Sequence, residues 1–238
     1  MEPAILYEDP HIIVCEKPEG ILTQSDRSLA PDMINILKNY LYSRNKAAGE
    51  PYIAAVHRLD RPVGGIMVFA KTPFAAGELS RQVNDRSMTK KYLAVVCSDL
   101  SGQINRERVL LTDYLVKDGR SNLSKITDPS DKKGKKAELY YSVISVQTKN
   151  EAPLSLLEID LLTGRHHQIR LQTSVHLGGI YGDTKYNPLF HVPSDTNKKT
   201  EWNKLALYSC SLTFRHPKTK KELTFKKSPK SGIFALFP

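Results

Sequence analysis

The segment from Val56 to Lys71 constrains the fold of this chain more than any other stretch. It reads VHRLDRPVGG and continues as the apolar run IMVFA before Lys71. Two adjacent glycines suit a tight turn or a close backbone approach, and the apolar run after them predicts a buried strand. Asp60 lies between Arg58 and Arg61, and nearby positive charge favours the ionised carboxylate. We therefore expect a loop that presents an activated carboxylate beside a surface that binds an anion.

The composition favours an anionic partner. The chain has 238 residues, 40% of them hydrophobic, and a formal net charge of +10. That excess favours nucleic acid, although lysines that only keep a protein dispersed give the same balance. The three cysteines, Cys15, Cys97 and Cys210, stand singly. This pattern predicts neither a zinc site nor a disulfide framework, so we expect a reducing compartment, the cytoplasm.

We expect neither a signal peptide nor a membrane partner. The first residues, MEPAI, start acidic and lack a long apolar core, unlike a secretory signal. No run of roughly 18 apolar residues occurs anywhere in the sequence, as a membrane span would need.

Strand patterns dominate the chain, with two or three helices between them. Strands are predicted over 12–17, 65–71, 91–97 and 154–161, and helices over 33–44, 74–83 and from the 162–170 segment to His176. Asp32 suits the N-cap of the first helix and Pro73 the first position of the second. Residues 216–221 predict a hairpin turn with a basic tip. We expect an α+β fold around a mixed, largely antiparallel sheet, as a single domain over 1–238.

A lysine-rich turn lies between residues 128 and 136. It contains Asp131 followed by KKGKK. A charge run of this kind is typical of a solvated loop, and contact with an RNA backbone is the alternative.

Three residues combine polar chemistry with apolar surroundings. They are Asp60 in its loop, Tyr92 at the entry to an apolar strand, and Arg165 after a Thr-Gly turn. Each has a structural alternative. Asp60 can be the salt-bridge partner of Arg58, Tyr92 a core tyrosine with a satisfied hydroxyl, and Arg165 a brace for the helix that follows.

Four motifs that occur in order resemble the RluA family of RNA pseudouridine synthases. They are residues 5–9 with 16–20, 57–60 with 65 and 70–72, 90–95, and 163–170 with 182–186. Residues 205–208 with 216–217 resemble the closing segment of that family. The resemblance covers essentially the whole chain. It implies the pseudouridine synthase fold, a central sheet flanked by helices with a central active-site cleft, and here without an N-terminal RNA-binding domain of the S4 type.

The resemblance implies isomerisation of uridine to pseudouridine in RNA, with Asp60 as the catalytic aspartate. Asp60 either attacks C1′ or removes a 2′ proton so that a glycal forms. Arg165 would oppose its charge, and Tyr92 would stack on the base and help remove the C5 proton. The reaction has no net redox change or hydrolysis, so we expect no metal and no organic cofactor.

The same resemblance implies an RNA partner, an rRNA or tRNA stem-loop whose target base leaves its stack. We expect no obligatory protein partner and a monomer. The candidates for RNA or substrate contact are His57, Arg58, Arg61, Lys71, Gln168 and Arg170.

Three histidines could suggest a metal cluster: His57, His166 and His167. We expect the adjacent pair to point in different directions, as neighbours do on any regular element, and no carboxylate stands at ligand spacing. We therefore expect no metal site.

The chain departs from the family pattern in three places. Val63-Gly64 stands where the family usually has Thr-Ser, His166 replaces a usual threonine, and residues 174–179 differ from the common sequence. Asp60, Tyr92 and Arg165 are retained, so we still expect activity, with target choice the property most open to change.

Two rival classes remain. One is a non-catalytic RNA-binding or RNA-folding factor, which would have no chemical reason to keep Asp60, Tyr92 and Arg165 together. The other is a different base-modifying enzyme. That class needs a donor site, and no glycine-rich nucleotide loop occurs in the sequence.

Overall fold

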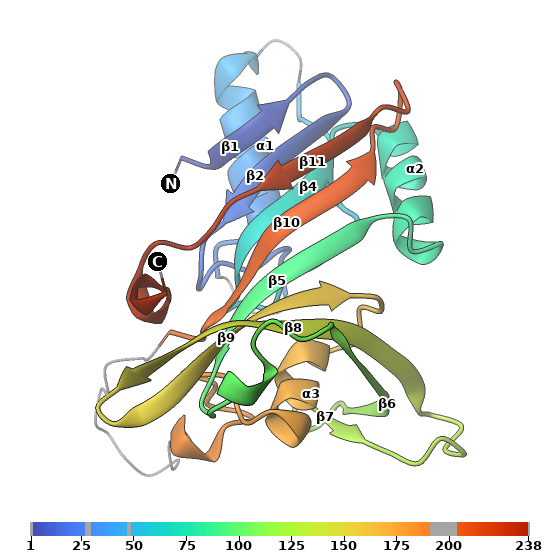
Figure 1. Cartoon of the computed structure of the whole chain (residues 1–238). Helices are drawn as coiled ribbons and strands as arrows, with labels where there is room; N and C mark the ends of the chain where they lie inside the picture. Colours follow the sequence, from blue (N-terminus) through green and yellow to red (C-terminus); the bar gives the residue numbers. More distant parts are fainter. Residues whose placement is uncertain (1, 27–29, 47–48, 191–203, 238) are drawn as a thin grey trace. The chain divides into compact units, whose positions relative to one another are not determined.

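The chain folds into two compact units in a computed structural model (Figure 1) that describes residues 2–26, 30–46, 49–190 and 204–237. One unit comprises residues 1–90 and 209–227, and the other comprises 91–208 and 228–238. The chain passes between them inside strands β5 (Thr89–Val96) and β10 (Leu207–Arg215), and again after Lys227. The single domain expected over 1–238 stays a prediction.

The first unit is a sheet accompanied by two helices. Its strands β1 (Ala4–Glu8), β2 (Ile12–Lys17), β4 (Gly64–Ala70) and β10 lie in that order. The short strand β3 (Ala54–Ala55) pairs with β4, and β11 (Glu222–Lys226) pairs with β10. All seven residues of β4 are buried. This confirms the buried strand that the apolar run predicts.

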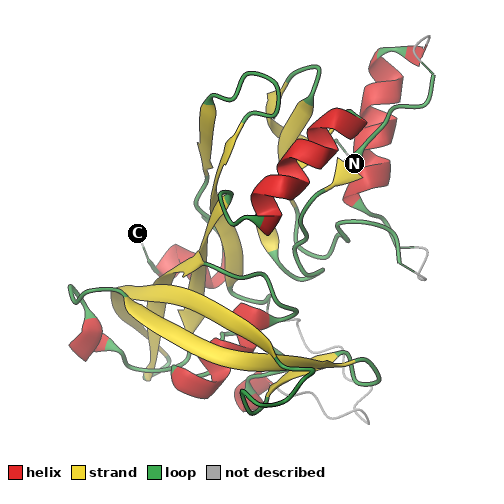
Figure 2. Ribbon diagram, turned by 90° about the vertical axis from the view of Figure 1, so that its right-hand side faces the viewer, coloured by secondary structure: helices red, strands yellow, loops and turns green. Residues whose placement is uncertain are grey.

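Helices α1 (Met33–Arg44) and α2 (Pro73–Asn84) begin where their capping residues predict. The Asp32 carboxylate accepts a 3.1 Å hydrogen bond from Asn35 N, and Pro73 occupies the first turn of α2. Figure 2 shows these helices in red. Side chains of α2 join those of β2, β4 and β10 in one core: Ile12, Val14, Ile66, Val68, Ala75, Leu79, Leu212 and Phe214.

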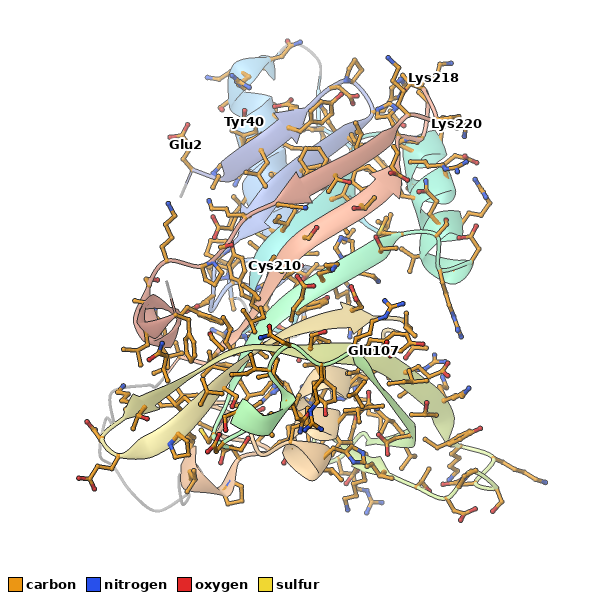
Figure 3. The ribbon with its side chains drawn as sticks, in the orientation of Figure 1. Glu2, Tyr40, Glu107, Cys210, Lys218 and Lys220 are labelled. Carbon is orange, nitrogen blue, oxygen red and sulfur yellow. The ribbon has the colours of Figure 1, made fainter. Side chains whose placement is uncertain are left out.

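The predicted hairpin at residues 216–221 joins β10 to β11 as expected. Lys218 and Lys220, labelled in Figure 3, are exposed at its tip. The Lys220 ammonium pairs with Glu78 of α2, so the hairpin is fixed to that helix.

The second unit is an antiparallel sheet that carries one α-helix. Its strands follow the order β5, β9 (Ala152–Leu161), β8 (Lys135–Lys149), β6 (Val109–Asp118) and β7 (Leu123–Ile126). Helix α3 (Gln168–His176) packs through Leu171 against Leu115 and Ala137. The mixed α+β, largely antiparallel fold expected from the sequence is confirmed. Short 3-10 helices lie at Ser101–Gln103, Pro188–Phe190 and Gly232–Leu236.

The lysine-rich stretch is partly a turn and partly a strand. Residues 128–134 form turns held by the Asp131 side chain, which accepts a 2.7 Å hydrogen bond from Thr127 Oγ1. Lys135 and Lys136 already belong to β8. No helix of the described residues combines the length and the apolar character that crossing a membrane requires.

Candidate active site

The loop that carries Asp60 is held by its main chain. Leu59, just before it, is 6% exposed, and Thr23 Oγ1 lies within hydrogen-bond distance of Leu59 O (3.0 Å) and Leu59 N (3.2 Å). Val63 N closes a turn onto Asp60 O at 2.9 Å. The backbone on both sides of Asp60 is therefore fixed, which preorganises the direction of its side chain.

Lys17 is the buried cation of this loop, and its role was missed from the sequence. Its side chain is fully buried. Its Nζ donates to Pro18 O (3.0 Å), Ile21 O (2.7 Å) and Arg61 O (3.2 Å). Burial lowers the pKa of Lys17 to about 8, and the charges of Asp60 and Glu19 partly counteract that effect. The signal was a lysine that ends a buried strand directly before a proline.

Gly65 lets β4 approach β10 at the end of this loop. Its φ is +127°, a conformation that side chains rarely adopt. A Cβ there would collide with the main chain of Ser209. The Ser209 hydroxyl also donates to Ile66 O at 3.2 Å. The glycine is therefore required by packing as well as by the turn.

His57 lies inside the unit rather than at its surface. It is 8% exposed, and its Nε2 accepts a 3.2 Å hydrogen bond from Val68 N. Burial, together with the positive charge of Lys90, lowers the pKa of His57 to about 3. His57 is therefore neutral at physiological pH, and it stabilises β4 by accepting the hydrogen bond from Val68 N.

The predicted basic contacts of the first unit differ in exposure. Arg58 and Arg61 are exposed, and Arg61 Nε donates to Gly20 O at 3.0 Å. Lys71 is mostly buried and forms a 2.8 Å ion pair with Glu8. The two arginines flanking Asp60 therefore face solvent, whereas Lys71 already has an internal partner.

Tyr92 lies in β5 of the second unit, opposite Ile159 of β9. It is 5% exposed. Its neighbour Lys91 forms ion pairs with Glu158 (2.7 Å) and Asp160 (3.4 Å). This pairing anchors β5 to β9 beside Tyr92.

Arg165 is half-buried and held at two atoms. Its main-chain N donates to Gln168 Oε1 at 3.0 Å, and its Nε donates to Lys136 O at 2.9 Å. Gln168, a predicted RNA contact, is 2% exposed, and its Oε1 also accepts from Thr163 Oγ1 at 2.7 Å. Gln168 therefore builds the turn that carries Arg165.

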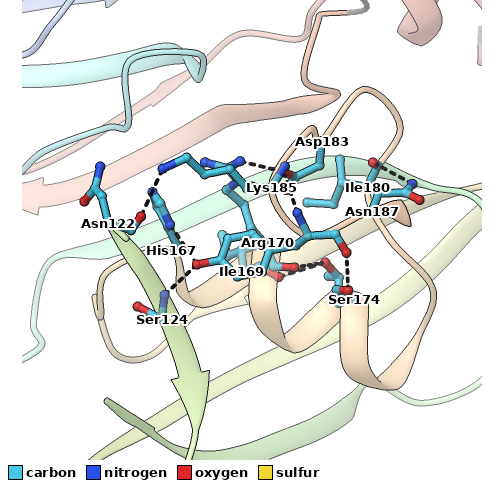
Figure 4. A network of polar contacts seen from close by, with 12 residues as sticks. Asn122, Ser124, His167, Ile169, Arg170, Ser174, Ile180, Asp183, Lys185 and Asn187 are labelled. Carbon is cyan, nitrogen blue, oxygen red and sulfur yellow. Dashed lines mark hydrogen bonds and ion pairs between the residues drawn. The ribbon is translucent and has the colours of Figure 1, made fainter. Parts of the chain in front are cut away.

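Arg170 is the centre of a buried network (Figure 4). Its guanidinium pairs with both oxygens of Asp183, Nε to Oδ2 at 2.8 Å and Nη2 to Oδ1 at 2.5 Å, with side chains 4% and 0% exposed. Asp183 Oδ1 also accepts from Lys185 N at 2.9 Å. This geometry favours a structural role for Arg170 over the phosphate contact expected from the sequence.

The expectation that His166 and His167 point in different directions is wrong. Their rings stack with centroids 3.8 Å apart and an interplanar angle of 29°. His167 has a left-handed φ of +52° at the start of α3. The alternation expected on a regular element therefore does not apply, and the helix begins only at Gln168. Within the part of the chain that the structure describes, no group of three potential ligands is suited to hold a metal ion.

Asp60 belongs to the first unit, whereas Tyr92 and Arg165 belong to the second. The predicted pairing of Asp60 with Arg165 therefore stays a prediction. What each unit supplies is clear: one presents a carboxylate on a fixed loop, and the other presents a tyrosine and a braced arginine. A carboxylate, a tyrosine and an arginine can serve nucleophilic or acid-base chemistry.

Solved structures place this fold in a known class. The domain described as human RNA pseudouridylate synthase domain containing 4 matches with a TM-score of 0.73 and 21% identity, covering 94% of this chain and 88% of that one. Human RNA pseudouridylate synthase domain containing 1 matches with a TM-score of 0.71 and 20% identity, covering 96% and 84%. The fold is thus that of RNA pseudouridylate synthase domains.

The sequence then gives the family. The family model described as RNA pseudouridylate synthase matches residues 11–175, and the chain belongs to this family, with RluA-type relatives as its motifs indicate. It is 30% identical to ribosomal large subunit pseudouridine synthase C of Buchnera aphidicola, over 93% of this chain and 66% of that protein. It is 29% identical to tRNA pseudouridine synthase C of Haemophilus ducreyi, over 94% and 90%. The chain therefore spans just under two thirds of the Buchnera relative and most of the Haemophilus relative.

Proposed function

We propose that this protein isomerises uridine to pseudouridine in rRNA or tRNA, with Asp60 as its essential carboxylate. The observation that carries the proposal is the construction of the Asp60 loop. Thr23 holds Leu59, and Lys17 holds Arg61, so the main chain on each side of the aspartate has a buried partner. A fixed backbone of this kind suits a residue that must reach one atom of a substrate.

The reaction breaks the bond between C1′ and N1 and forms a bond between C1′ and C5. The base leaves with the electron pair of the first bond, turns, and returns that pair through C5. The C5 proton is then lost and N1 gains a proton, so atoms and electrons balance without a cofactor. Asp60 acts either by attack on C1′ or by removal of a 2′ proton, and both routes need its ionised form.

Tyr92 and Arg165 keep the roles that the family resemblance implies. Tyr92 stacks on the target base and assists loss of the C5 proton. Arg165 supplies the charge that opposes the Asp60 carboxylate in the RNA-bound enzyme. The hydrogen bond from Arg165 Nε to Lys136 O supports this proposal, because it restrains the side chain near the guanidinium.

The exposed arginines Arg58 and Arg61 are the proposed phosphate contacts of the first unit. Contacts of this type position the RNA without reading its sequence. His57, Lys71, Gln168 and Arg170 are instead assigned to supporting roles, since each already has a partner inside its unit.

The alternative is an RNA-binding factor that uses the same fold without catalysis. To separate the two, unmodified rRNA and tRNA are incubated with wild type, with Asp60→Ala, and with Asp99→Ala as a control in an exposed turn. Pseudouridine is then mapped by position. Product from wild type and Asp99→Ala, and none from Asp60→Ala, supports the proposal. RNA binding without product from any of the three proteins favours the binding factor.

A further inference from the structure

The turn between β6 and β7 meets the segment after Arg165 at one polar junction. Ser124, the second residue of β7, donates its main-chain N–H to Tyr186 Oη at 2.7 Å. Its hydroxyl lies 2.8 Å from His166 O and 2.9 Å from His166 Nδ1. One serine therefore contacts the main chain and the side chain of the residue next to Arg165.

Asn122 holds the other edge of the same imidazole. Its Oδ1 lies 3.1 Å from His166 Nε2. The one hydroxyl proton of Ser124 goes to His166 O, so Nδ1 of the ring donates to Ser124 Oγ and Nε2 faces the side-chain amide of Asn122. Both ring nitrogens of His166 then have a partner on the β6–β7 turn.

His167 closes the junction from the opposite side. Its ring stacks on His166, and its Nδ1 lies 2.9 Å from Tyr186 Oη. Tyr186 Oη therefore contacts both the Ser124 main chain and the His167 ring. Burial, followed by the charges of Arg170 and His166, lowers the pKa of His167 to about 2. The His167 ring therefore stays neutral throughout the physiological range.

Arg165 stands directly before these residues in the chain and has hydrogen bonds of its own. Its N–H is fixed by Gln168 Oε1 and its Nε–H by Lys136 O. The Arg165 carbonyl accepts from Gln168 N at 3.2 Å, and Ser124 fixes the next peptide, 166–167, through His166 O. Arg165 is thus restrained on both sides, and the β6–β7 turn restrains the 166–167 peptide next to it.

We propose that His166 is a positioning residue, which couples the Asn122–Ser124 turn to Arg165 and sets the direction of the Arg165 guanidinium. This inference rests on the proposed function for its catalytic consequence. His166 itself need not touch substrate. The ring contacts hold Ser124 where it donates to His166 O, so their loss weakens that bond and lets the 166–167 peptide rotate. A small displacement of the Arg165 guanidinium then weakens its action on the reacting groups.

Two substitutions test the coupling from its two ends. His166→Ala removes both ring contacts, and His166→Gln retains an amide that reaches Asn122. Asn122→Gly removes only the side-chain partner of His166 Nε2. Asn122 has a φ of +50°, which glycine adopts freely, and its main-chain O, the acceptor of Lys185 Nζ, remains. His176→Ala is the matched control, because His176 is another histidine of the same unit, at the end of α3, and pairs with Asp113 at 3.0 Å.

The first readout is single-site pseudouridine kinetics on the mapped RNA. We expect His166→Ala and Asn122→Gly to lower kcat about tenfold, with KM within twofold of wild type, because the RNA contacts are untouched. The double variant should be no slower than the slower single variant, since both changes break one coupling. His166→Gln should recover at least half of the wild-type kcat, and His176→Ala should match wild type. Wild-type kcat in His166→Ala, or a rise in KM alone, overturns the proposal.

The second readout needs no reaction. The Nε–H signal of Arg165 in a proton–nitrogen NMR spectrum, assigned by its loss in Arg165→Lys, should shift in His166→Ala and Asn122→Gly and stay in place in His176→Ala. An unshifted signal in both variants overturns the coupling. If wild type makes no pseudouridine, the proposed function fails, while this spectrum still decides whether His166 positions Arg165.

Discussion

Lys17 Nζ donates a 3.2 Å hydrogen bond to the main-chain oxygen of Arg61, a residue 44 positions later in the chain. The same oxygen accepts from Gly20 N at 2.8 Å. The end of β2 and the turn after it therefore hold the loop of the proposed catalytic aspartate. This relationship explains how a short loop with two glycines keeps one conformation.

Replacement of this buried cation should change stability in a pH-dependent way. Lys17→Met leaves three main-chain oxygens without their Nζ donor, and we expect a loss of about 2 kcal/mol in unfolding free energy at pH 7. The folded pKa of about 8 lies below the ordinary lysine pKa of 10.5. Between those values the unfolded chain binds more protons, so the Lys17 contribution grows more favourable as pH rises. Urea unfolding at pH 7.5 and 9.5 measures it.

The comparison between the two proteins isolates Lys17 from other groups that titrate at high pH. The stability difference, wild type minus Lys17→Met, should increase from pH 7.5 to pH 9.5 by about 1 kcal/mol or more. A difference that is constant across this range would show that Lys17 is not held with a depressed pKa.

Gly65 offers a sharp test of the packing beneath the loop. Gly65→Ala places a Cβ against the Ser209 main chain at a φ of +127°, and we expect a loss of about 3 kcal/mol or failure to fold. Gly77→Ala is the control: Gly77 lies in α2 with no atom within 4 Å of an added Cβ. That change should stabilise by up to about 1 kcal/mol. Similar melting temperatures for the two variants would contradict the packing described here.

Arg58 should contribute to RNA affinity through a phosphate. Arg58→Ala is expected to weaken binding to every RNA by a similar factor and to reduce the slope of log K against log salt by about 0.7 to 0.9. Filter binding between 50 and 200 mM salt measures the slope. Arg120→Ala is the comparison variant, because Arg120 is an exposed arginine of the second unit, in the turn after β6. A slope equal to that of wild type would remove Arg58 from the phosphate contacts.

The Arg170–Asp183 pair should act as a structural unit. Arg170→Met strands a buried carboxylate, and we expect a loss of about 3 to 5 kcal/mol. The double variant Arg170→Met with Asp183→Leu should lose less than the sum of the single variants, because no charge is left buried alone. Urea unfolding of the four proteins gives the coupling. Additive losses would show that the two residues act independently.

Local patterns predicted much of the fold. The helix caps at Asp32 and Thr72 and the apolar run of β4 are short-range signals, and they locate their elements closely. Candidate site residues were recognised from motifs, because family resemblance depends on spacing along the chain. Neither kind of signal states which side chains meet.

The remaining features depend on contacts between distant segments. Lys17 is buried beside a loop that follows it by more than forty residues, and Arg170 pairs with an aspartate beyond α3. A charged side chain is expected at the surface unless a partner is known, so the role of Lys17 was overlooked and the internal partner of Arg170 was not predicted. The stacking of His166 on His167 follows from one left-handed residue, His167, which no periodicity indicates.

The most direct test of the central claim is the conversion of uridine by Asp60→Asn. Asparagine retains the size of the side chain and removes the negative charge, so the loop held by Lys17 and Thr23 should stay folded. Single-turnover pseudouridine formation on the mapped RNA should fall at least a thousandfold, with RNA affinity within about threefold of wild type. Conversion at a rate within tenfold of wild type would contradict the assignment of Asp60 as the essential carboxylate.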